Sequence, residues 1–360
     1  MDDVIVIGAG LLGTAAAVFL AEGGARVTVL ERDVVAAAAS GRNAGSIQHP
    51  LDGVRAPLYA ESLEHYRRFG VIEGPPPGLL AVGFDPSAAR TALSAAAPFG
   101  ELEPELLEGE ALRAAEPALA PGLFGCRLAT GYPVAPAAAT GRFAAAARAL
   151  GVRIEEGVAA RPAIEGGRVT GVETPAGRRA AGAVLVAAGP WTPELVDPTG
   201  GWRPVSALWG VTVRVALERP PLHRIEEWDG DGGQDLAALA QFEVTPVGDV
   251  CVLGATRTVL EPDPAAVAEA VRERATRFLP AVGEAPTVAV RACPRPLSRD
   301  DVPLLGPLPG AGGLHVATGH GAYGISLGPA SARIAADAIL GRAEVPAAYA
   351  ADRLGVPALT

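Results

Sequence analysis

The N-terminal residues carry the clearest alternation of hydrophobic and polar positions in the chain. Residues 3–8 form a short apolar run of strand character, and residues 11–22 have the composition of a helix. Gly23 and Gly24 break that helix, and residues 26–30 form a second β-rich run. This order predicts a strand, a helix and a second strand, which together begin a βαβ unit.

The rest of the chain alternates between helical and strand patterns, with proline and glycine clusters between them. The EGPPPG turn at 73–78 indicates a crossing into another domain, and the buried strand at 183–188 indicates a return to the first. A strand, a glycine loop and a last helix close the chain at 312–340. The other predicted helices are 54–69, 136–150 and 264–278, and the other predicted strands are 79–84, 205–217, 241–245 and 250–253.

A glycine-rich turn, GAGLLG at residues 8–13, joins the first predicted strand to the first predicted helix. Gly8 permits a tight turn, Gly10 lets the backbone approach a pyrophosphate, and Gly13 allows close packing of the helix on the strand. The helix N-terminus supplies free N–H groups and partial positive charge. Glu31 ends the second strand, where it can accept hydrogen bonds from ribose hydroxyls and disfavours a 2′-phosphate. The pattern predicts a dinucleotide site for a cofactor other than NADP.

Composition narrows the class of protein. The chain has 360 residues, of which 49% are hydrophobic and 19% charged, which is typical of one or two joined globular domains. Its net charge of -10, without long basic runs, argues against nucleic acid as a partner. All 30 basic side chains are arginine, so chemistry that needs a lysine ammonium or a Schiff base is excluded.

The sulfur and imidazole side chains show no pattern of a disulfide framework or a metal site. The three cysteines are widely spaced, without a C-x-x-C pair, and the five histidines have no ligand spacing. The first residues lead directly into an apolar strand, and no apolar run approaches the length of a membrane span. These features predict no bound metal, no integral membrane segment and a cytoplasmic location.

Five segments, in their order and spacing, resemble the FAD-dependent amine and amino-acid oxidoreductases grouped with D-amino-acid dehydrogenase, glycine oxidase and monomeric sarcosine oxidase. The likeness spans nearly the whole chain. It is carried by the N-terminal turn, ASGRNAG at 39–45, AAGPW at 187–191, PRPLSRDDVPLLGPLPG at 294–310 and ATGHGAYGISLGPAS at 317–331.

The resemblance implies an α/β fold with a Rossmann-type FAD-binding domain of the glutathione-reductase type. It also implies an α+β substrate domain with a large mixed or antiparallel sheet. Combined with the pattern of elements, it divides the chain into a discontinuous FAD-binding domain (1–77, 132–203 and 291–346), a substrate-binding domain (78–131 and 204–290) and a C-terminal tail (347–360). In such proteins the segment like 40–46 runs past the isoalloxazine and pyrophosphate, and the loop like 319–325 lies by the flavin ring.

The cofactor is therefore expected to be FAD, held by residues from each of these segments. A helix N-terminus beside the flavin ring would favour the negative charge that develops on reduction. The expected FAD-binding residues are Gly8, Gly10, Leu11, Leu12, Gly13, Glu31, Arg32, Ser40, Arg42, Asn43, Ala44, Gly45, Ser46, Val158, Ala188, Gly189, Trp191, Cys293, Gly319, His320, Gly321, Ala322, Tyr323, Gly324, Ile325 and Ser326.

The resemblance further implies oxidation of a C–N bond by hydride transfer to flavin N5. The substrate would be an amino acid or secondary amine, and the imine formed would hydrolyse to an oxo acid or aldehyde plus amine. Arg295 matches the position where glycine-oxidase-like members carry the arginine that binds the substrate carboxylate, and its planar fork suits bidentate binding. The alternative is a structural ion pair of Arg295 with Asp300 or Asp301.

Two departures from the family pattern bear on the substrate. Glycine-oxidase-like members have a further arginine where this chain has Ala322, and sarcosine-oxidase-like members have a lysine near Ser326. This chain therefore lacks both of the additional cations that contact the substrate carboxylate in those relatives. Their absence argues against plain glycine or sarcosine as the substrate, unless Arg42 or Arg257 compensates. Tyr323 either shapes the pocket and hydrogen-bonds the substrate, or is a packed loop aromatic.

Three further alternatives remain open. Cys293 falls where sarcosine-oxidase-like members join the flavin covalently, although a buried cysteine is usually a small hydrophobic residue. The electron acceptor is either oxygen or another compound, and the absence of the lysine that promotes oxygen reaction favours a dehydrogenase. The chain is also open to interpretation as a flavin-binding subunit that needs a partner subunit in an amine dehydrogenase, or as an NAD-linked dehydrogenase.

Overall fold

A parallel sheet grows from the N-terminal βαβ unit. The computed structural model describes residues 2–228 and 240–357, and in it β1 (Asp2–Ile7), α1 (Leu11–Glu22) and β2 (Val27–Leu30) lie as the sequence predicts. β1 pairs in parallel with β2 and with β11 (Gly177–Val186). These strands are apolar on both faces because both faces are covered. The sheet order is β17-β18-β11-β1-β2-β8, completed by β8 (Arg153–Glu155), β17 (Leu304–Pro307) and β18 (Leu314–Thr318).

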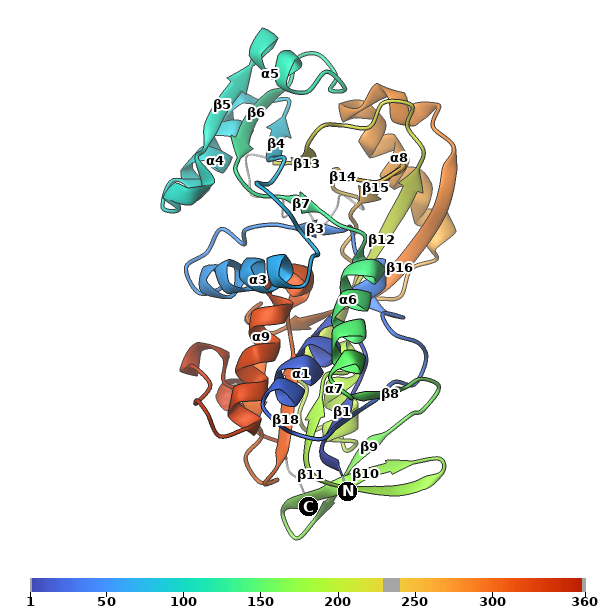
Figure 1. Cartoon of the computed structure of the whole chain (residues 1–360). Coiled ribbons are helices and arrows are strands. Elements are labelled where there is room, and N and C mark those ends of the chain that lie inside the picture. Colours follow the sequence, from blue (N-terminus) through green and yellow to red (C-terminus); the bar gives the residue numbers. More distant parts are fainter. Residues whose placement is uncertain (1, 229–239, 358–360) are drawn as a thin grey trace.

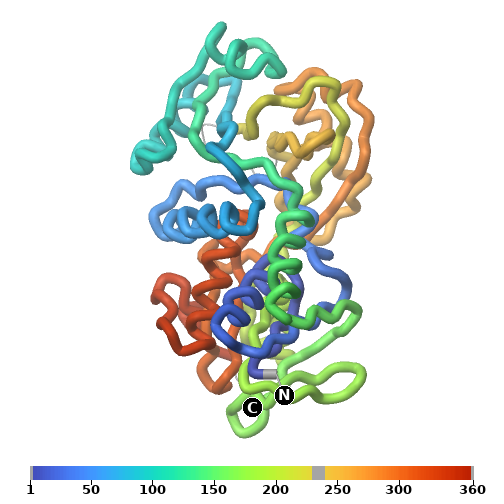
Figure 2. Tube along the Cα trace, in the orientation of Figure 1, coloured from blue at the N-terminus to red at the C-terminus, as the bar shows by residue number. Residues whose placement is uncertain are grey.

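Helices from distant parts of the chain cover one face of this first sheet. Segments from the start, the middle and the end of the sequence lie side by side in the lower half of Figure 2. β9 (Arg161–Glu165) and β10 (Arg168–Thr174) extend β11 as an antiparallel meander, and α7 (Thr192–Val196) follows β11. The helices of this layer are α1, α6 (Pro136–Ala149) and α9 (Gly324–Ile339), and α3 (Ala56–Arg68) packs on α9.

A second sheet fills the upper half of the molecule in Figure 1. Its order is β16-β12-β15-β14-β13-β4-β6-β5, and it is mixed because β13 and β4 run parallel while the other described pairs are antiparallel. Two short strands, β3 (Ser46–Ile47) and β7 (Tyr132–Pro133), pair between the two large sheets. The strands are β4 (Leu79–Gly83), β5 (Glu105–Glu108), β6 (Phe124–Leu128), β12 (Val205–Val215), β13 (Arg224–Glu227), β14 (Glu243–Val247), β15 (Val250–Gly254) and β16 (Thr287–Ser298), with helices α4 (Pro86–Ala96), α5 (Gly109–Ala115) and α8 (Pro264–Phe278).

The two faces of the second sheet differ in chemistry because side chains alternate along a strand. On β12, Val211, Val213 and Val215 enter a hydrophobic core together with residues of α8. Thr212 and Arg214 lie on the opposite face, which is polar and meets α2 (Ala39–Arg42) through a contact of Arg291 with Gly41. From this sheet, Arg295 and Pro296 line the cavity described below.

The structure agrees with most of the predicted elements and adds several that the sequence pattern did not predict, of which β16 matters most for the site. The mixed second sheet and the first sheet, whose central strands are parallel, match the expected α/β architecture. β16 is a long strand paired along β12, whereas the sequence indicated only a motif from residue 294 onward. The domain boundary expected at residue 291 falls inside this strand. The described part of the expected tail, residues 347–357, includes the buried Tyr349 and Ala351.

Candidate active site

The glycine-rich turn at residues 8–13 brings backbone atoms too close together for larger side chains. Gly8 has a φ of 106°, and a Cβ on Gly13 would lie 1.9 Å from the carbonyl oxygen of Gly8. The start of α1 therefore packs directly on the end of β1, with its free N–H groups at the cavity. The N–H of Leu11 donates to Ser40 Oγ at 2.9 Å, which connects α2 to this turn.

Glu31 and two neighbours shape the end of the cavity beside β2. Glu31 Oε2 accepts a hydrogen bond from the N–H of Ala9 at 2.8 Å, and Oε1 accepts one from the N–H of Asp33 at 2.9 Å. The carboxylate is thus fixed beside the glycine turn. The guanidinium of Arg32 lies 4.0 Å from the ring centroid of Trp191, so the two side chains stack.

A single cavity continues from this turn to the loop at the start of α9. It contains seventeen of the residues that the sequence predicted to bind FAD, together with Arg295. The predicted residues on its wall are Gly8, Gly10, Leu11, Leu12, Glu31, Arg32, Ser40, Asn43, Val158, Ala188, Gly189, Trp191, His320, Gly321, Ala322, Gly324 and Ile325.

Nine predicted FAD-binding residues are not on this wall. Neighbours within one motif point in different directions, so a motif identifies a segment and not each contact. Ser326 Oγ, for example, accepts from the N–H of Gln48 at 3.0 Å, and Gly13 packs on Gly8. The nine are Gly13, Arg42, Ala44, Gly45, Ser46, Cys293, Gly319, Tyr323 and Ser326.

The wall also contains residues that the sequence did not single out. Most are small or apolar neighbours of the predicted ones, and only their position after a strand or beside a motif could have indicated them. They are Ile7, Leu30, Asp33, Ala37, Ala38, Ala39, Ala159, Ala160, Ala187, Pro190, Glu194, Leu195, Pro296, Ala317 and Thr318.

His320 is a buried polar side chain on this wall. Neither of its ring nitrogens has a hydrogen-bond partner among the described residues. Burial lowers the pKa of the imidazole to about 3, so the ring is neutral at physiological pH. A buried ring without partners is costly, and a polar ligand in the cavity would supply them.

Arg295 projects from β16 into the same cavity. Its guanidinium lies over Gly210, so that a Cβ added to Gly210 would lie 1.9 Å from Nη2 of Arg295. Nη1 of Arg295 donates a hydrogen bond to the carbonyl oxygen of Thr256 at 3.2 Å. The alternative ion pairs are not formed, because Asp300 pairs with Arg353 and Asp301 with Arg55. Among the described residues, no carboxylate pairs with Arg295.

The acidic side chains nearest this region are held by another arginine. Arg224 is 2% exposed, and its Nη2 donates to Glu243 at 2.5 Å and to Glu226 at 3.3 Å. Burial alone would raise the pKa of Glu243, but the charges of Arg224, Arg295 and Arg257 lower it below its ordinary value. Glu243 is therefore ionised and committed to Arg224, which leaves the Arg295 guanidinium available.

Tyr323 and Arg257 lie close to this acidic pair. Burial, followed by the charge of Glu226, raises the pKa of Tyr323 to about 12, so the phenol stays protonated. Arg55 stacks on the Tyr323 ring at 4.5 Å, and the charge of Arg257 also acts on Tyr323. Arg257 is exposed and forms no ion pair with any described residue. The structure thus places Tyr323 and Arg257, which the sequence nominated for contact with the substrate, in the same region as Arg295, although only Arg295 is on the cavity wall.

Comparison with known proteins decides the family. A family model described as FAD dependent oxidoreductase matches residues 3–338 of the chain. The chain belongs to this family. A glycine oxidase from Pseudomonas aeruginosa is 30% identical over 377 residues, covering 97% of this chain and 98% of that protein. A D-amino acid dehydrogenase from Cereibacter sphaeroides is 33% identical over 197 residues, covering 54% of this chain and 43% of that protein. The solved structure of a glycine oxidase from Bacillus cereus is similar with a TM-score of 0.82 at 27% identity, covering 96% of each chain.

This oxidoreductase therefore uses FAD, and the alternative of an NAD-linked dehydrogenase is wrong. The predicted fold class is confirmed by the solved relatives. The cavity fits the cofactor: the glycine turn and the α1 N-terminus would hold the pyrophosphate, and Glu31 would hold the ribose. The unpartnered nitrogens of His320 lie where a polar ligand group would satisfy them.

Within residues 2–228 and 240–357, no group of three or more His, Cys, Asp or Glu side chains is placed to hold a metal ion. Over the same residues, no helix is both long enough and apolar enough to cross a membrane.

Proposed function

We propose that the enzyme oxidises the C–N bond of an amino acid or a secondary amine. The observation that carries this proposal is the guanidinium of Arg295, which projects into the FAD cavity and pairs with no carboxylate in residues 2–228 or 240–357. A fixed, unpaired arginine suits a substrate carboxylate because its planar fork binds both oxygens. The relatives named glycine oxidase and D-amino acid dehydrogenase support the same class of substrate.

Each residue near Arg295 has a distinct part in this proposal. The bound flavin supplies the hydride acceptor, and the imine product hydrolyses to an oxo acid or aldehyde plus amine. Arg295 holds the carboxylate and so orients the carbon next to nitrogen. Arg224 keeps Glu243 from pairing with Arg295. Tyr323, as a neutral phenol, is available to donate a hydrogen bond to the substrate.

An anaerobic screen tests the reaction whatever the electron acceptor is. D-amino acids, L-amino acids, N-methylated amino acids, proline analogues and simple amines are mixed with the flavin-loaded enzyme, and bleaching of the flavin absorbance is followed. Bleaching by carboxylate-bearing amines, but not by their decarboxylated analogues, is expected. Bleaching by both sets equally would contradict a role for Arg295 in carboxylate binding.

The Arg295→Leu variant should raise KM for the amino-acid substrate by roughly 100-fold, because a charge-assisted bidentate contact is lost. Gly210→Ala provides a matched test, since the added methyl occupies the place of the Arg295 Nη2 atom and leaves the charge unchanged. It should also raise KM, with full flavin content. Steady-state kinetics and flavin absorbance measure both effects; an unchanged KM in both variants would refute the assignment.

We also propose that electrons leave to an acceptor other than oxygen and that FAD is held without a covalent bond. No lysine is present to promote the oxygen reaction. Cys293 is 1% exposed, burial raises the pKa of its thiol, and it is not on the cavity wall. Reduced enzyme should therefore persist in aerated buffer beyond one turnover, and acid precipitation should release all yellow colour. Rapid reoxidation would contradict the first proposal, and a yellow pellet the second.

The two sheets support the expected division of labour within the chain. We propose that the FAD-binding domain consists of residues 1–77, 132–203 and 291–346. The substrate-binding domain consists of residues 78–131 and 204–290, and within it residues 229–239 lie outside the described part of the chain. The chain covers 98% of the glycine oxidase from Pseudomonas aeruginosa, which supports activity without a partner subunit. Full flavin loading without bleaching by any amine would instead favour a subunit that needs a partner.

A further inference from the structure

Three arginines gather on the polar face of the second sheet, beyond Arg295. Arg291 lies directly opposite Thr212 in the pairing of β16 with β12, and Arg214 follows two residues along β12 on the same face. Nη1 of Arg291 reaches the carbonyl oxygen of Gly41 at 3.5 Å. That contact brings the guanidinium to the backbone next to Arg42, the last residue of α2.

These arginines lack the acidic partners that other arginines of the chain have. Arg55, Arg224 and Arg353 each form ion pairs with carboxylates. Over the described ranges, no carboxylate pairs with Arg42, Arg214 or Arg291. Burial, together with the charges of Arg214 and Arg42, lowers the pKa of Arg291, as expected when like charges share a site without compensation.

Two buried polar groups between these cations also lack a partner. Thr212 is 3% exposed, and its Oγ1 forms no hydrogen bond with a described residue. Nε of Arg214 is likewise buried and unpartnered. Because unmade hydrogen bonds of buried groups are unfavourable, this arrangement of donors indicates an acceptor other than the described residues of the chain.

We propose that Arg42, Arg214, Arg291 and the hydroxyl of Thr212 form a second anion-binding site, which takes a carboxylate or another oxyanion of similar size. An oxyanion neutralises the clustered positive charge and accepts hydrogen bonds from both guanidinium and hydroxyl donors. The site is separate from that of Arg295, because none of its four residues is on the wall of the FAD cavity. It does not depend on the proposed oxidation of amino acids.

Inorganic sulfate is the probe for a direct test on the flavin-loaded enzyme. Titration calorimetry in a low-salt buffer should show sulfate binding, and sulfate should raise the melting temperature. Arg291→Gln should bind sulfate about tenfold more weakly than the parent. Arg42→Gln, which changes an exposed side chain, should show a loss of similar size. Both variants should also melt at a higher temperature than the parent in sulfate-free buffer, because repulsion among the cations is relieved.

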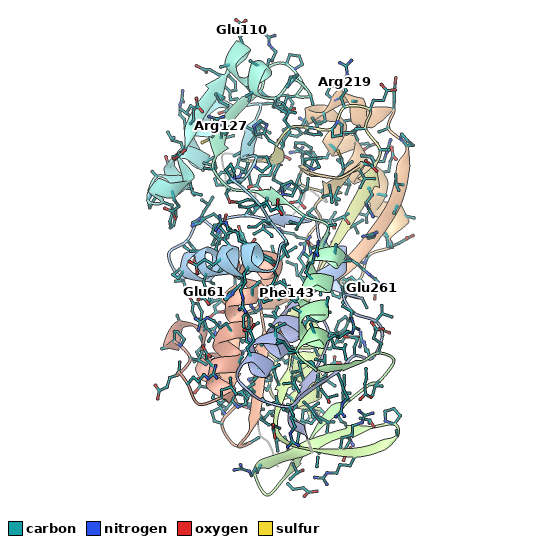
Figure 3. All side chains as sticks on the ribbon, in the orientation of Figure 1. Glu61, Glu110, Arg127, Phe143, Arg219 and Glu261 are labelled. Carbon is teal, nitrogen blue, oxygen red and sulfur yellow. The ribbon has the colours of Figure 1, made fainter. Side chains whose placement is uncertain are left out.

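Arg219→Gln is the matched control, since Arg219 is an exposed arginine at the far end of the upper half of the molecule (Figure 3). It should bind sulfate as the parent does and show no gain in melting temperature. Sulfate affinity within twofold of the parent in both Arg291→Gln and Arg42→Gln would overturn the proposal. So would an equal sulfate effect on the melting temperature of all variants, which would indicate a general salt effect.

Kinetics distinguish whether the anion is a carboxylate of the substrate or a free ion. This experiment rests on the proposed function. Glutamate and glutamine of the active chirality differ only at the end of the side chain, where glutamate has a carboxylate and glutamine has an uncharged amide. If that carboxylate occupies the site, sulfate competes with glutamate, and Arg291→Gln raises KM for glutamate but not for glutamine. If a free anion occupies it, neither KM changes in the variant while sulfate still binds. Failure of all amino acids to reduce the flavin would contradict the proposed function and leave the sulfate result intact.

Discussion

At the scale of single residues, the partners that the fold supplies decide what a charged side chain does. Arg224 and Arg295 are the same residue type on strands of one sheet. Arg224 is almost fully buried and is neutralised by Glu226 and Glu243. Among the described residues, Arg295 has only a carbonyl oxygen as partner, and it remains available for a ligand. The difference follows from where the carboxylates lie, and not from the arginines themselves.

His315 illustrates how burial alone changes the titration of a residue. Burial lowers the pKa of its imidazole to about 4, from an ordinary value near 6.5. Between these two values the His315 imidazole binds a proton in the unfolded chain but not in the folded chain. The free energy of unfolding therefore decreases as the pH falls below about 6.5. His315→Gln should reduce the loss of unfolding free energy between pH 7.5 and 5.5 by roughly 1 kcal/mol. Urea unfolding of both proteins at the two pH values measures this; equal losses would show that His315 titrates normally.

At the scale of elements, strand pairing and helix packing bring the predicted motifs together. The sequence predicted the N-terminal strand, helix and strand because apolar patterning, the glycine turn and Glu31 agree locally. It did not predict β16, because that strand is defined by its pairing with β12, and its prolines and arginines do not form a β-rich run. Arg291 thus comes to lie opposite Thr212 only through the register of two strands.

The contact between α1 and the end of β1 gives a prediction at this scale. In Gly13→Ala the new Cβ would lie 1.9 Å from the carbonyl oxygen of Gly8, so the helix must shift away from the turn. We expect loss of most bound FAD and a lower melting temperature, measured by flavin absorbance and thermal unfolding. Gly141→Ala in α6 is the control, because no atom lies within 4 Å of its added Cβ. It should retain FAD and gain about 0.5–1 kcal/mol of stability.

At the scale of the whole molecule, a polar network joins the two sheets beside the cavity. Gln48 comes from the segment after β3, and its side chain accepts from Arg224 Nε at 3.2 Å and donates to Glu226 at 3.2 Å. Its backbone N–H donates to Ser326 at the start of α9. The second sheet is therefore joined to α9 by hydrogen bonds between distant parts of the sequence.

Removing the central cation of this network should destabilise the whole protein. Arg224→Met leaves the carboxylates of Glu226 and Glu243 without their partner, which we expect to lower the unfolding free energy by about 3–5 kcal/mol. The double variant with Glu243→Gln should recover part of that loss, because one of the uncompensated charges is removed. Chemical unfolding of the flavin-loaded proteins measures both values. A loss below about 1 kcal/mol in Arg224→Met would contradict this account of the network.

The sequence by itself determined the dinucleotide turn, the α/β class and, through its resemblance, the FAD-dependent family. Those features depend on local patterns or on motifs that survive in order along the chain. Only the tertiary structure decided that Arg295 is unpaired, that Glu243 belongs to Arg224, and that Arg42, Arg214 and Arg291 share one face. Each of these features depends on contacts between residues that are distant in sequence. Strand register and domain packing determine those contacts, and the local sequence pattern does not predict them.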